Sequence, residues 1–370
     1  MAVSRAIGLM SGTSLDGVDV ALIETDGEAV SAFGPVGYRA YRDAERALLQ
    51  QALAEATALT DRTARPGVLA QAEQQVTDIH AQTVETFLAK NGIAGDSVTV
   101  VGFHGQTVLH RPHDRLTVQI GDGKALARRL GIPVAHDFRA ADVAAGGHGA
   151  PLVAIFHRAL VGKLDRPDPI AVLNIGGVAN VTWCNGEVPP IACDTGPGNA
   201  LIDDFMRAHT GRALDDGGVM ASRGKPDADF IGRVLGDPFF ALDPPKSLDR
   251  NAFAYASLTL PKLSIADGAA TLAALTAAAV ARVIPQLPVA PATWIVAGGG
   301  ARNRALIQFL AQGLAPATVE TADAVGWSAD ALEAQAFAYL AVRTMRGLPI
   351  TFPSTTGVPK PMTGGIVVKP

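Results

Sequence analysis

Two turns of small polar residues offer the clearest chemistry in this sequence. The first lies within Arg5–Glu24 and the second within Ile170–Thr182, and two β-rich runs flank each turn, as in a hairpin. Gly, Ser, Thr and Asn gathered at one point present backbone N–H groups and hydroxyls, which are the donors that a polyphosphate needs. Two such hairpins, about one domain apart, predict a duplicated fold that holds a nucleotide from both sides.

The first turn, Gly12–Asp19, is the sharper of the two motifs. Its phosphate donors would be Gly12, Thr13, Ser14 and Gly17. Asp16 or Asp19 could hold Mg²⁺ through water. Gly, Ser and Asp are also common in ordinary hairpin turns, so a plain hairpin stays open as an alternative. The turn is not a Walker A loop, because no Gly-Lys-Ser/Thr follows it.

A carboxylate, Asp194, ends the predicted strand 189–194, and Thr195-Gly-Pro-Gly-Asn199 then leads into a predicted helix over 200–209. A carboxylate at this place can serve as a general base, beside a helix N-terminus that favours anions. A helix N-cap with turn glycines is the alternative. Farther on, Gly298–Gly300 separate a strand from a helix and would let a flat ring or a phosphate approach the backbone.

The run His104–His113 is polar where the predicted buried strand 97–103 ends. Its amide and imidazole groups suit the hydroxyl and acetamido groups of a sugar. An alternative metal site would use His104, His110, His113, His136 and His148 with Asp137 or Asp142. These spacings match neither the His-Glu-x-x-His motif nor a Cys/His zinc frame, which favours ordinary loop histidines.

Two further polar clusters, 215–218 and 246–250, are predicted to be solvated loops. Glu333 lies in an otherwise apolar predicted helix over 330–346, either on its wet face or reaching into a cleft, and periodicity does not decide between the two. The tract 268–280 is apolar and Ala-rich but short, which favours a buried helix over a membrane span.

Strand and helix patterns alternate in both halves of the chain, which predicts an α/β architecture with mixed sheets. In the first half we expect strands at 32–38, 97–103 and 132–135, and helices at 41–59 and 68–90. The Gly-, His- and Asp-rich loop 136–149 is where we expect the chain to cross between domains.

Composition narrows the class of protein. A length of 370 residues favours two domains, and 48% hydrophobic with 18% charged residues is typical of folded cores. A net charge of −4 argues against a bulk nucleic-acid or anionic-membrane binder. Two cysteines are too few for a disulfide framework, and the first ten residues lack the apolar core of a signal peptide. We therefore expect a cytoplasmic protein with no nucleic-acid or membrane partner.

Taken together, five segments resemble the anhydro-N-acetylmuramic acid kinases. They are Met10–Asp19, Gly102–Thr107, Leu173–Asn180, Asp194–Asn199 and Ala297–Asn303, in this order across nearly the whole chain. Any one of them alone is weak, whereas the set is highly specific. The resemblance implies a transferase that uses ATP and Mg²⁺ to open the 1,6-anhydro bridge of the sugar with water and to phosphorylate the freed O6. The product is N-acetylmuramic acid 6-phosphate, in cell-wall recycling.

The fold that the resemblance implies is α/β, with two RNase H-like domains of the actin/hexokinase/Hsp70 type and an interdomain ATP cleft. We expect one domain at 1–135 plus 345–370, with the first phosphate hairpin and part of the sugar site. The other, at 136–344, would carry the second hairpin, the catalytic Asp and the adenosine site. We also expect a homodimer.

The resemblance assigns roles to individual residues. Asp194 becomes the base that deprotonates the attacking water. The first phosphate hairpin is Gly12, Thr13, Ser14, Leu15, Asp16, Gly17, Val18 and Asp19. Asn174, Gly176 and Gly177 form the second, and Gly298, Gly299 and Gly300 lie near the adenosine. The candidates for sugar contacts are His104, Gln106, Thr107, Arg139 and Glu333.

Three other functions stay open on the residues alone. A non-catalytic or polymerising member of the actin-like fold would keep both hairpins but would not need Asp194. A metallohydrolase would use the histidine-rich loops. A kinase for a different amino sugar would share the whole fold, because a fold by itself does not select a sugar.

Overall fold

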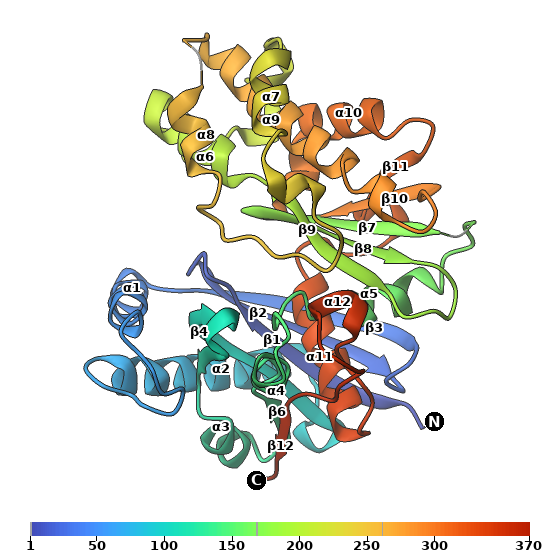
Figure 1. Cartoon of the computed structure of the whole chain (residues 1–370). Coiled ribbons are helices and arrows are strands. Elements are labelled where there is room, and N and C mark those ends of the chain that lie inside the picture. Colours follow the sequence, from blue (N-terminus) through green and yellow to red (C-terminus); the bar gives the residue numbers. More distant parts are fainter. Residues whose placement is uncertain (1, 168, 261) are drawn as a thin grey trace. The chain divides into compact units, whose positions relative to one another are not determined.

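The computed structural model describes residues 2–167, 169–260 and 262–370. The chain divides into two compact units, the first made of Met1–Leu160 with Ala331–Pro370 and the second of Val161–Asp330. Figure 1 shows the chain coloured along its sequence. Each unit contains a sheet with helices packed on it, which confirms the α/β architecture.

Within its described residues, the first unit contains a seven-stranded sheet in the order β12-β6-β4-β1-β2-β3, with β5 paired to β4. The strands are β1 (Ser4–Ser11), β2 (Gly17–Thr25), β3 (Val30–Ala40), β4 (Val100–Arg111), β5 (Leu116–Ile120), β6 (Val134–His136) and β12 (Ile366–Val368). The helices are α1 (Asp43–Ala56), α2 (Leu69–Asn91), α3 (Gly123–Leu130), α4 (Ala140–Ala144), α11 (Leu332–Met345) and α12 (Pro353–Thr356), and α5 (Ala154–Val161) ends at the unit boundary.

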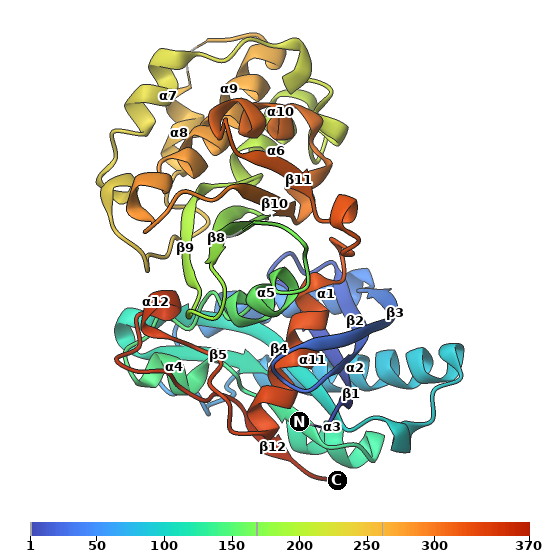
Figure 2. The same ribbon diagram turned by 90° about the vertical axis from the view of Figure 1, so that its right-hand side faces the viewer.

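Helix α11 lies unusually close to this sheet, and two glycines make the approach possible. Gly8 of β1 and Gly102 of β4 are directly paired neighbours. A Cβ on Gly8 would lie 1.8 Å from the carbonyl oxygen of Ala334, and one on Gly102 would lie 2.1 Å from that of Phe337. Figure 2 shows α11 crossing these strands. The alternate residues of β1 and β4 pack into the core with α1, α2 and α3, on the opposite face.

The unit boundaries differ from the expected ones. The sequence placed 136–160 and 331–344 in the second domain, whereas the structure places them in the first. His136 ends β6, which pairs with both β4 and β12, so the chain has not yet left the first sheet there. Helix α11 contacts β1, β2 and β4 and therefore also belongs to this unit.

The second unit contains, in its described part, a five-stranded sheet in the order β11-β10-β7-β8-β9. The strands are β7 (Ile170–Ile175), β8 (Val178–Cys184), β9 (Ile191–Pro197), β10 (Thr293–Ala297) and β11 (Thr318–Thr321). The helices are α6 (Ala200–Thr210), α7 (Ala228–Val234), α8 (Ala254–Thr259), α9 (Ile265–Ala281) and α10 (Arg304–Gly313). Short 3₁₀ helices span Asp216–Gly218, Ala221–Arg223, Pro238–Ala241, Ile284–Gln286, Gly299–Arg302 and Asp323–Val325 in this unit, and Gly95–Ser97 and Pro112–Asp114 in the first.

The two sheets repeat one topology. In each, an antiparallel three-stranded meander is followed by parallel strands on the side of its first strand, which gives β3-β2-β1-β4-β6 in one and β9-β8-β7-β10-β11 in the other. The order 3-2-1-4-5 is that of an RNase H-like domain. The duplication that the two hairpins predicted is therefore confirmed at the level of topology.

The predicted apolar helix forms α9, and most of its residues are buried. It is the one helix among the described residues that is long and apolar enough to span a membrane by length and composition alone. Leu272, Leu275 and Val280 instead lie in the hydrophobic core of the second unit, together with α6 and α10.

Candidate active site

The first turn, which was predicted to bind phosphate, connects β1 to β2, so the predicted hairpin is present. Gly12, Thr13, Ser14 and Asp16 are accessible at its tip, whereas Leu15 is buried and anchors the turn. The Asp16 carboxylate accepts hydrogen bonds from the Ser14 hydroxyl (2.8 Å) and from the Gly17 N–H (3.0 Å). One oxygen of Asp16 thus stabilises the turn itself.

Gln106 holds this turn from the neighbouring strand. Its Oε1 accepts a hydrogen bond from the Ser11 hydroxyl at 2.5 Å, and its Nε2 donates to the carbonyl oxygen of Gly12 at 3.1 Å. The side chain is fully buried. Gln106 was predicted to contact the sugar; in the structure its amide is bonded to Ser11 and Gly12 at the first turn.

Two glycines of the turn have different surroundings. A Cβ on Gly12 would meet nothing nearer than the Ser14 hydroxyl at 3.5 Å, which is an ordinary contact. A Cβ on Gly17 would lie 2.4 Å from the carbonyl oxygen of Arg39 and 2.6 Å from the Tyr38 ring. Packing explains the glycine at 17, whereas the space beside Gly12 is open to a ligand.

The second turn, Gly176–Gly177 between β7 and β8, is joined to two other predicted segments. The N–H of Asn199 donates to the carbonyl oxygen of Gly176 (2.8 Å), and its side-chain Nδ2 donates to that of Ile175 (3.2 Å). Gly298 has φ +74°, and a Cβ there would lie 2.5 Å from Oδ1 of Asn174. The structure thus brings together Asn174, the second turn, Asn199 and the three glycines, which are far apart in the sequence.

Asp194 lies within β9 and not at its end, because the strand continues to Pro197. Its Oδ2 accepts a hydrogen bond from the Leu248 N–H at 2.6 Å. Burial raises the pKa of Asp194 from 3.8 to about 7, and the Leu248 hydrogen bond opposes this rise only in part. A carboxyl group with such a pKa is half ionised near neutral pH and is suited to take a proton from water.

The loop 246–250 was predicted to be mostly solvated surface; Ser247, Asp249 and Arg250 are exposed, whereas its first residue departs from the prediction. Lys246 is buried, its carbonyl oxygen accepts the Asp194 N–H at 2.9 Å, and its ammonium donates to Phe239 O (3.2 Å) and Gln286 Oε1 (3.1 Å). The lysine charge is therefore directed to other acceptors, so burial dominates the pKa of Asp194.

The cluster 215–218 was also predicted to be a solvated loop, but its first residue has a structural role. Asp215 is buried and accepts hydrogen bonds from the N–H groups of Met220 (2.8 Å) and Ala221 (2.9 Å).

Three of the predicted sugar contacts lie on one strand, and a fourth, Arg139, reaches one of them from a loop. His104, Gln106 and Thr107 lie inside β4, because pairing with β5 extends that strand to Arg111. Thr107 Oγ1 accepts a hydrogen bond from Gln119 (3.3 Å). His104 is hydrogen-bonded to Arg139, whose guanidinium donates to His104 Nε2 at 3.2 Å.

Two charged groups accompany His104. Burial lowers the pKa of Arg139 to about 10, so it stays cationic at neutral pH. Burial and Arg139 together lower the pKa of His104 to about 3. Glu333 is exposed on the first turn of α11, yet the surrounding protein atoms raise its pKa, against the attraction of Arg139. Both ring nitrogens of His104 are engaged, Nδ1 with the Gly105 carbonyl oxygen (2.8 Å) and Nε2 with Arg139, so Arg139 and Glu333 are the groups that offer a donor and an acceptor to a ligand.

The loop that carries Arg139 is held by a buried carboxylate. Asp142 Oδ1 accepts the Gly149 N–H at 2.6 Å, and Oδ2 accepts the Thr356 hydroxyl at 2.6 Å. Arg139 in turn donates to the carbonyl oxygen of Gly149 at 2.7 Å. This loop was expected to be a crossing between domains; it is instead an ordered support for Arg139.

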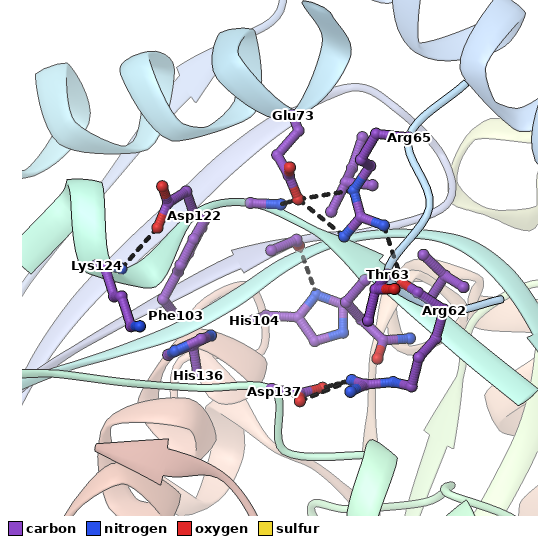
Figure 3. Close-up of a pocket in the computed structure, with 15 residues that line it drawn as sticks. Arg62, Thr63, Arg65, Glu73, Phe103, His104, Asp122, Lys124, His136 and Asp137 are labelled. Carbon is purple, nitrogen blue, oxygen red and sulfur yellow. Dashed lines mark hydrogen bonds and ion pairs between the residues drawn. The ribbon is translucent and has the colours of Figure 1, made fainter. Parts of the chain in front are cut away.

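A pocket of about 600 Å³ in the first unit includes His104 in its wall. Figure 3 shows its paired charges: Arg62 lies against Asp137 (2.6 Å), and Arg65 lies against Glu73 (2.9 Å). Lys124 and His136 also line it. Polar walls and this volume suit a small hydroxylated ligand.

Comparison with known proteins identifies the family. Residues 4–370 match the model of the family described as anhydro-N-acetylmuramic acid kinase. The chain belongs to this family. A relative named anhydro-N-acetylmuramic acid kinase from Nitrobacter winogradskyi is 64% identical over 365 residues, which cover 99% of each chain. Another of that name, from Rhodopseudomonas palustris, is 61% identical over 99% of this chain and 100% of the relative.

Solved structures similar to this anhydro-N-acetylmuramic acid kinase family member are more distant. Component A of the (R)-2-hydroxyglutaryl-CoA dehydratase of Acidaminococcus fermentans has a TM-score of 0.49 and 12% identity, covering 93% of this chain and 99% of that one. A ROK family glucokinase from Streptomyces griseus, in complex with glucose and AMPPNP, has a TM-score of 0.42 and 15% identity, covering 91% and 99%.

Some residues beside the site were not singled out from the sequence. Leu248 supports Asp194 through its backbone, which leaves no mark on residue type. Asn199 had a visible signal, since it closes the Asp194–Asn199 motif. Arg250 lies beside the second turn, 3.3 Å from where a Cβ on Gly177 would be, and was grouped with solvated residues.

Among the described residues, no group of three or more His, Cys, Asp or Glu side chains is arranged to hold a metal ion.

Proposed function

We propose that this chain is an ATP-dependent kinase that opens the 1,6-anhydro bond of 1,6-anhydro-N-acetylmuramic acid with water and phosphorylates O6. The products are N-acetylmuramic acid 6-phosphate and ADP. The observation that carries the proposal is Asp194, a carboxylate whose pKa lies at about 7 in a member of this kinase family. A base with that pKa suits the activation of water at neutral pH.

In the proposed reaction, water opens the ring bond and the freed oxygen takes the phosphoryl group. The oxygen of water bonds to C1, and its proton passes to Asp194. The C1–O6 bond breaks, O6 bonds to the γ-phosphorus, and the bond from that phosphorus to the bridging oxygen of ADP breaks. Water attacks C1 from the face opposite to the leaving O6, so the anomeric centre inverts.

Backbone groups are proposed to hold the nucleotide. The turn at Gly12–Gly17 offers N–H groups and the Thr13 and Ser14 hydroxyls, and open space beside Gly12 supports a phosphate there. Gly176, Gly177 and Gly298–Gly300 are proposed to hold the rest of ATP. Mg²⁺ would neutralise phosphate charge, and Asp16 of the turn and Asp19 of β2 are carboxylates that suit its hydrated form.

The sugar is proposed to contact His104, Arg139 and Glu333. The Arg139 cation, held by His104 Nε2, can bind the acetamido oxygen or the carboxylate of the substrate, and Glu333 can accept from its hydroxyls. His104 also lines the 600 Å³ pocket, which supports placing part of the sugar there. We further propose a cytoplasmic homodimer that acts in peptidoglycan recycling, since ATP and a turnover fragment of the wall would be its substrates.

The test is ADP formation with anhydro-N-acetylmuramic acid, N-acetylmuramic acid and N-acetylglucosamine, each assayed in water enriched in ¹⁸O. We expect ADP only with the anhydro-sugar, with ¹⁸O at the C1 hydroxyl and none in the phosphate ester. ¹⁸O in free phosphate would show simple ATP hydrolysis. Faster turnover of another amino sugar would favour a kinase of different specificity.

A further inference from the structure

A row of three polar side chains crosses the sheet of the second unit. Asn174 of β7 is paired directly with Asn180 of β8, and Asn180 is paired directly with Asp194 of β9. Residues opposite one another on neighbouring strands point to the same face of a sheet. The flanking residues Leu173, Val181 and Cys193 belong to the hydrophobic core on the other face. The row therefore runs from the phosphate turn to the proposed base, and Asn180 is its middle member.

The backbone brings Asn180 and Asp194 close together. The N–H of Asp194 points away from β8, because it donates to the carbonyl oxygen of Lys246 at 2.9 Å. Asn180 and Asp194 therefore form a non-hydrogen-bonded pair, the kind in which side chains approach most closely. Between Ala179 and Asn180 the register shifts, so that Thr195 is an extra residue in β9. Such a bulge next to a functional residue re-aims its side chain.

Asn180 also carries an unsatisfied acceptor. Its Oδ1 is buried and has no hydrogen-bond partner among the residues that the structure describes. A buried polar atom without a partner destabilises the folded state, so its presence beside a reacting group points to a bound partner in the working enzyme. Asp194 keeps one oxygen on Leu248 N–H, which leaves the other for water.

We propose that Asn180 Oδ1 accepts a hydrogen bond from the attacking water and, with Asp194, orients it toward C1 of the sugar. This inference rests on the proposed function. Water has two hydrogens: the one bonded to Asp194 is transferred to the carboxylate, and the one bonded to Asn180 stays on oxygen and becomes the C1 hydroxyl of the product. Asn180 takes no proton. With both hydrogens fixed by acceptors, a lone pair of the water is directed to the carbon.

The test compares Asn180→Leu with a matched control. Leucine has nearly the shape of asparagine but removes the acceptor, so kcat should fall about tenfold to a hundredfold. The KM for ATP should not change. Because an unsatisfied buried acceptor is removed, Tm should stay the same or rise. Gln335→Leu removes another buried amide oxygen without a partner, in helix α11, and should leave kcat unchanged.

A second variant reports on proximity to the base. Asn180→Asp keeps an acceptor but places a negative charge beside Asp194, which raises the pKa of that carboxyl. The acid limb of the kcat profile should move to higher pH by about one unit or more. A position 180 whose side chain lay away from Asp194 would not move it.

Wild-type kcat in Asn180→Leu, a loss of kcat matched by a loss of Tm, or an unmoved acid limb in Asn180→Asp would each overturn this role while the proposed function stands. Failure of the wild-type enzyme to consume anhydro-N-acetylmuramic acid would overturn both.

Discussion

Replacing Asp194 with Asn should make the enzyme nearly inactive and more stable at the same time. Asparagine keeps the size of the side chain, and its Oδ1 can still accept the Leu248 N–H. It cannot take a proton from water, so kcat should fall about a hundredfold or more. A residue that acts only as structural support would lose stability when changed, which makes the combination diagnostic.

The gain in stability follows from the pKa of Asp194. Burial raises it from 3.8 to about 7. At about 1.4 kcal/mol for each tenfold change in acid dissociation, ionisation of this buried carboxyl destabilises the folded state by about 4 kcal/mol. Between these two pH values the folded chain holds a proton that the unfolded chain has released. The free energy of unfolding therefore falls as the pH rises from 3.8 toward 7. Asparagine is neutral at every pH and does not suffer this loss.

The assay is thermal unfolding of wild type and Asp194→Asn at pH 5, 6.5 and 8, with coupled measurement of ADP on the same samples. Tm of the variant should exceed that of wild type by about 8 °C at pH 8, and the gap should narrow toward pH 5. Asp243→Asn, an exposed carboxylate of the same unit, should change neither Tm nor kcat. Near-normal kcat, or a lower Tm at pH 8, would refute the reasoning.

Four further outcomes can be measured by enzyme kinetics, calorimetry and unfolding. The kcat/KM of the wild type should fall about tenfold for each pH unit below an apparent pKa near 7, because Asp194 must be ionised, and a flat profile from pH 5 to 8 would contradict this. Gly12→Ala should raise the KM for ATP and leave Tm unchanged, whereas Gly17→Ala should lower Tm because its Cβ meets Arg39 O. Unchanged ATP affinity of Gly12→Ala by calorimetry would show that the first turn binds no phosphate. Gln106→Leu should destabilise the protein by about 1–3 kcal/mol, measured by denaturant unfolding, because it leaves the Gly12 carbonyl and the Ser11 hydroxyl without this partner. Arg139→Met should raise the KM for the sugar and leave calorimetric binding of ATP unchanged, and the opposite pattern would remove Arg139 from the sugar side.

The sequence by itself determined the local elements and the family. Both hairpins formed where small turn residues separate β-rich runs, because that pattern specifies a hairpin over a few residues. The five ordered motifs identified the kinase family before any geometry was known, and the family comparison confirmed it. The two hairpins predicted the duplication, whereas the shared strand order 3-2-1-4-5 comes from the structure, because the two halves share a pattern of elements and not residues.

What only the tertiary structure decided depends on contacts between distant segments. The observed unit boundaries differ from the predicted ones because β6 pairs with the first sheet and α11 packs closely on Gly8 and Gly102. Local composition does not reveal these contacts. Gln106 was expected at the sugar, yet its amide is bonded to the phosphate turn, since a residue type does not specify its partner. The pKa of Asp194 is raised by burial. Asn180 lies beside Asp194 because of the strand register and the bulge between β8 and β9. None of these is a property of a short stretch of sequence, because each arises where strands far apart in the chain are brought side by side.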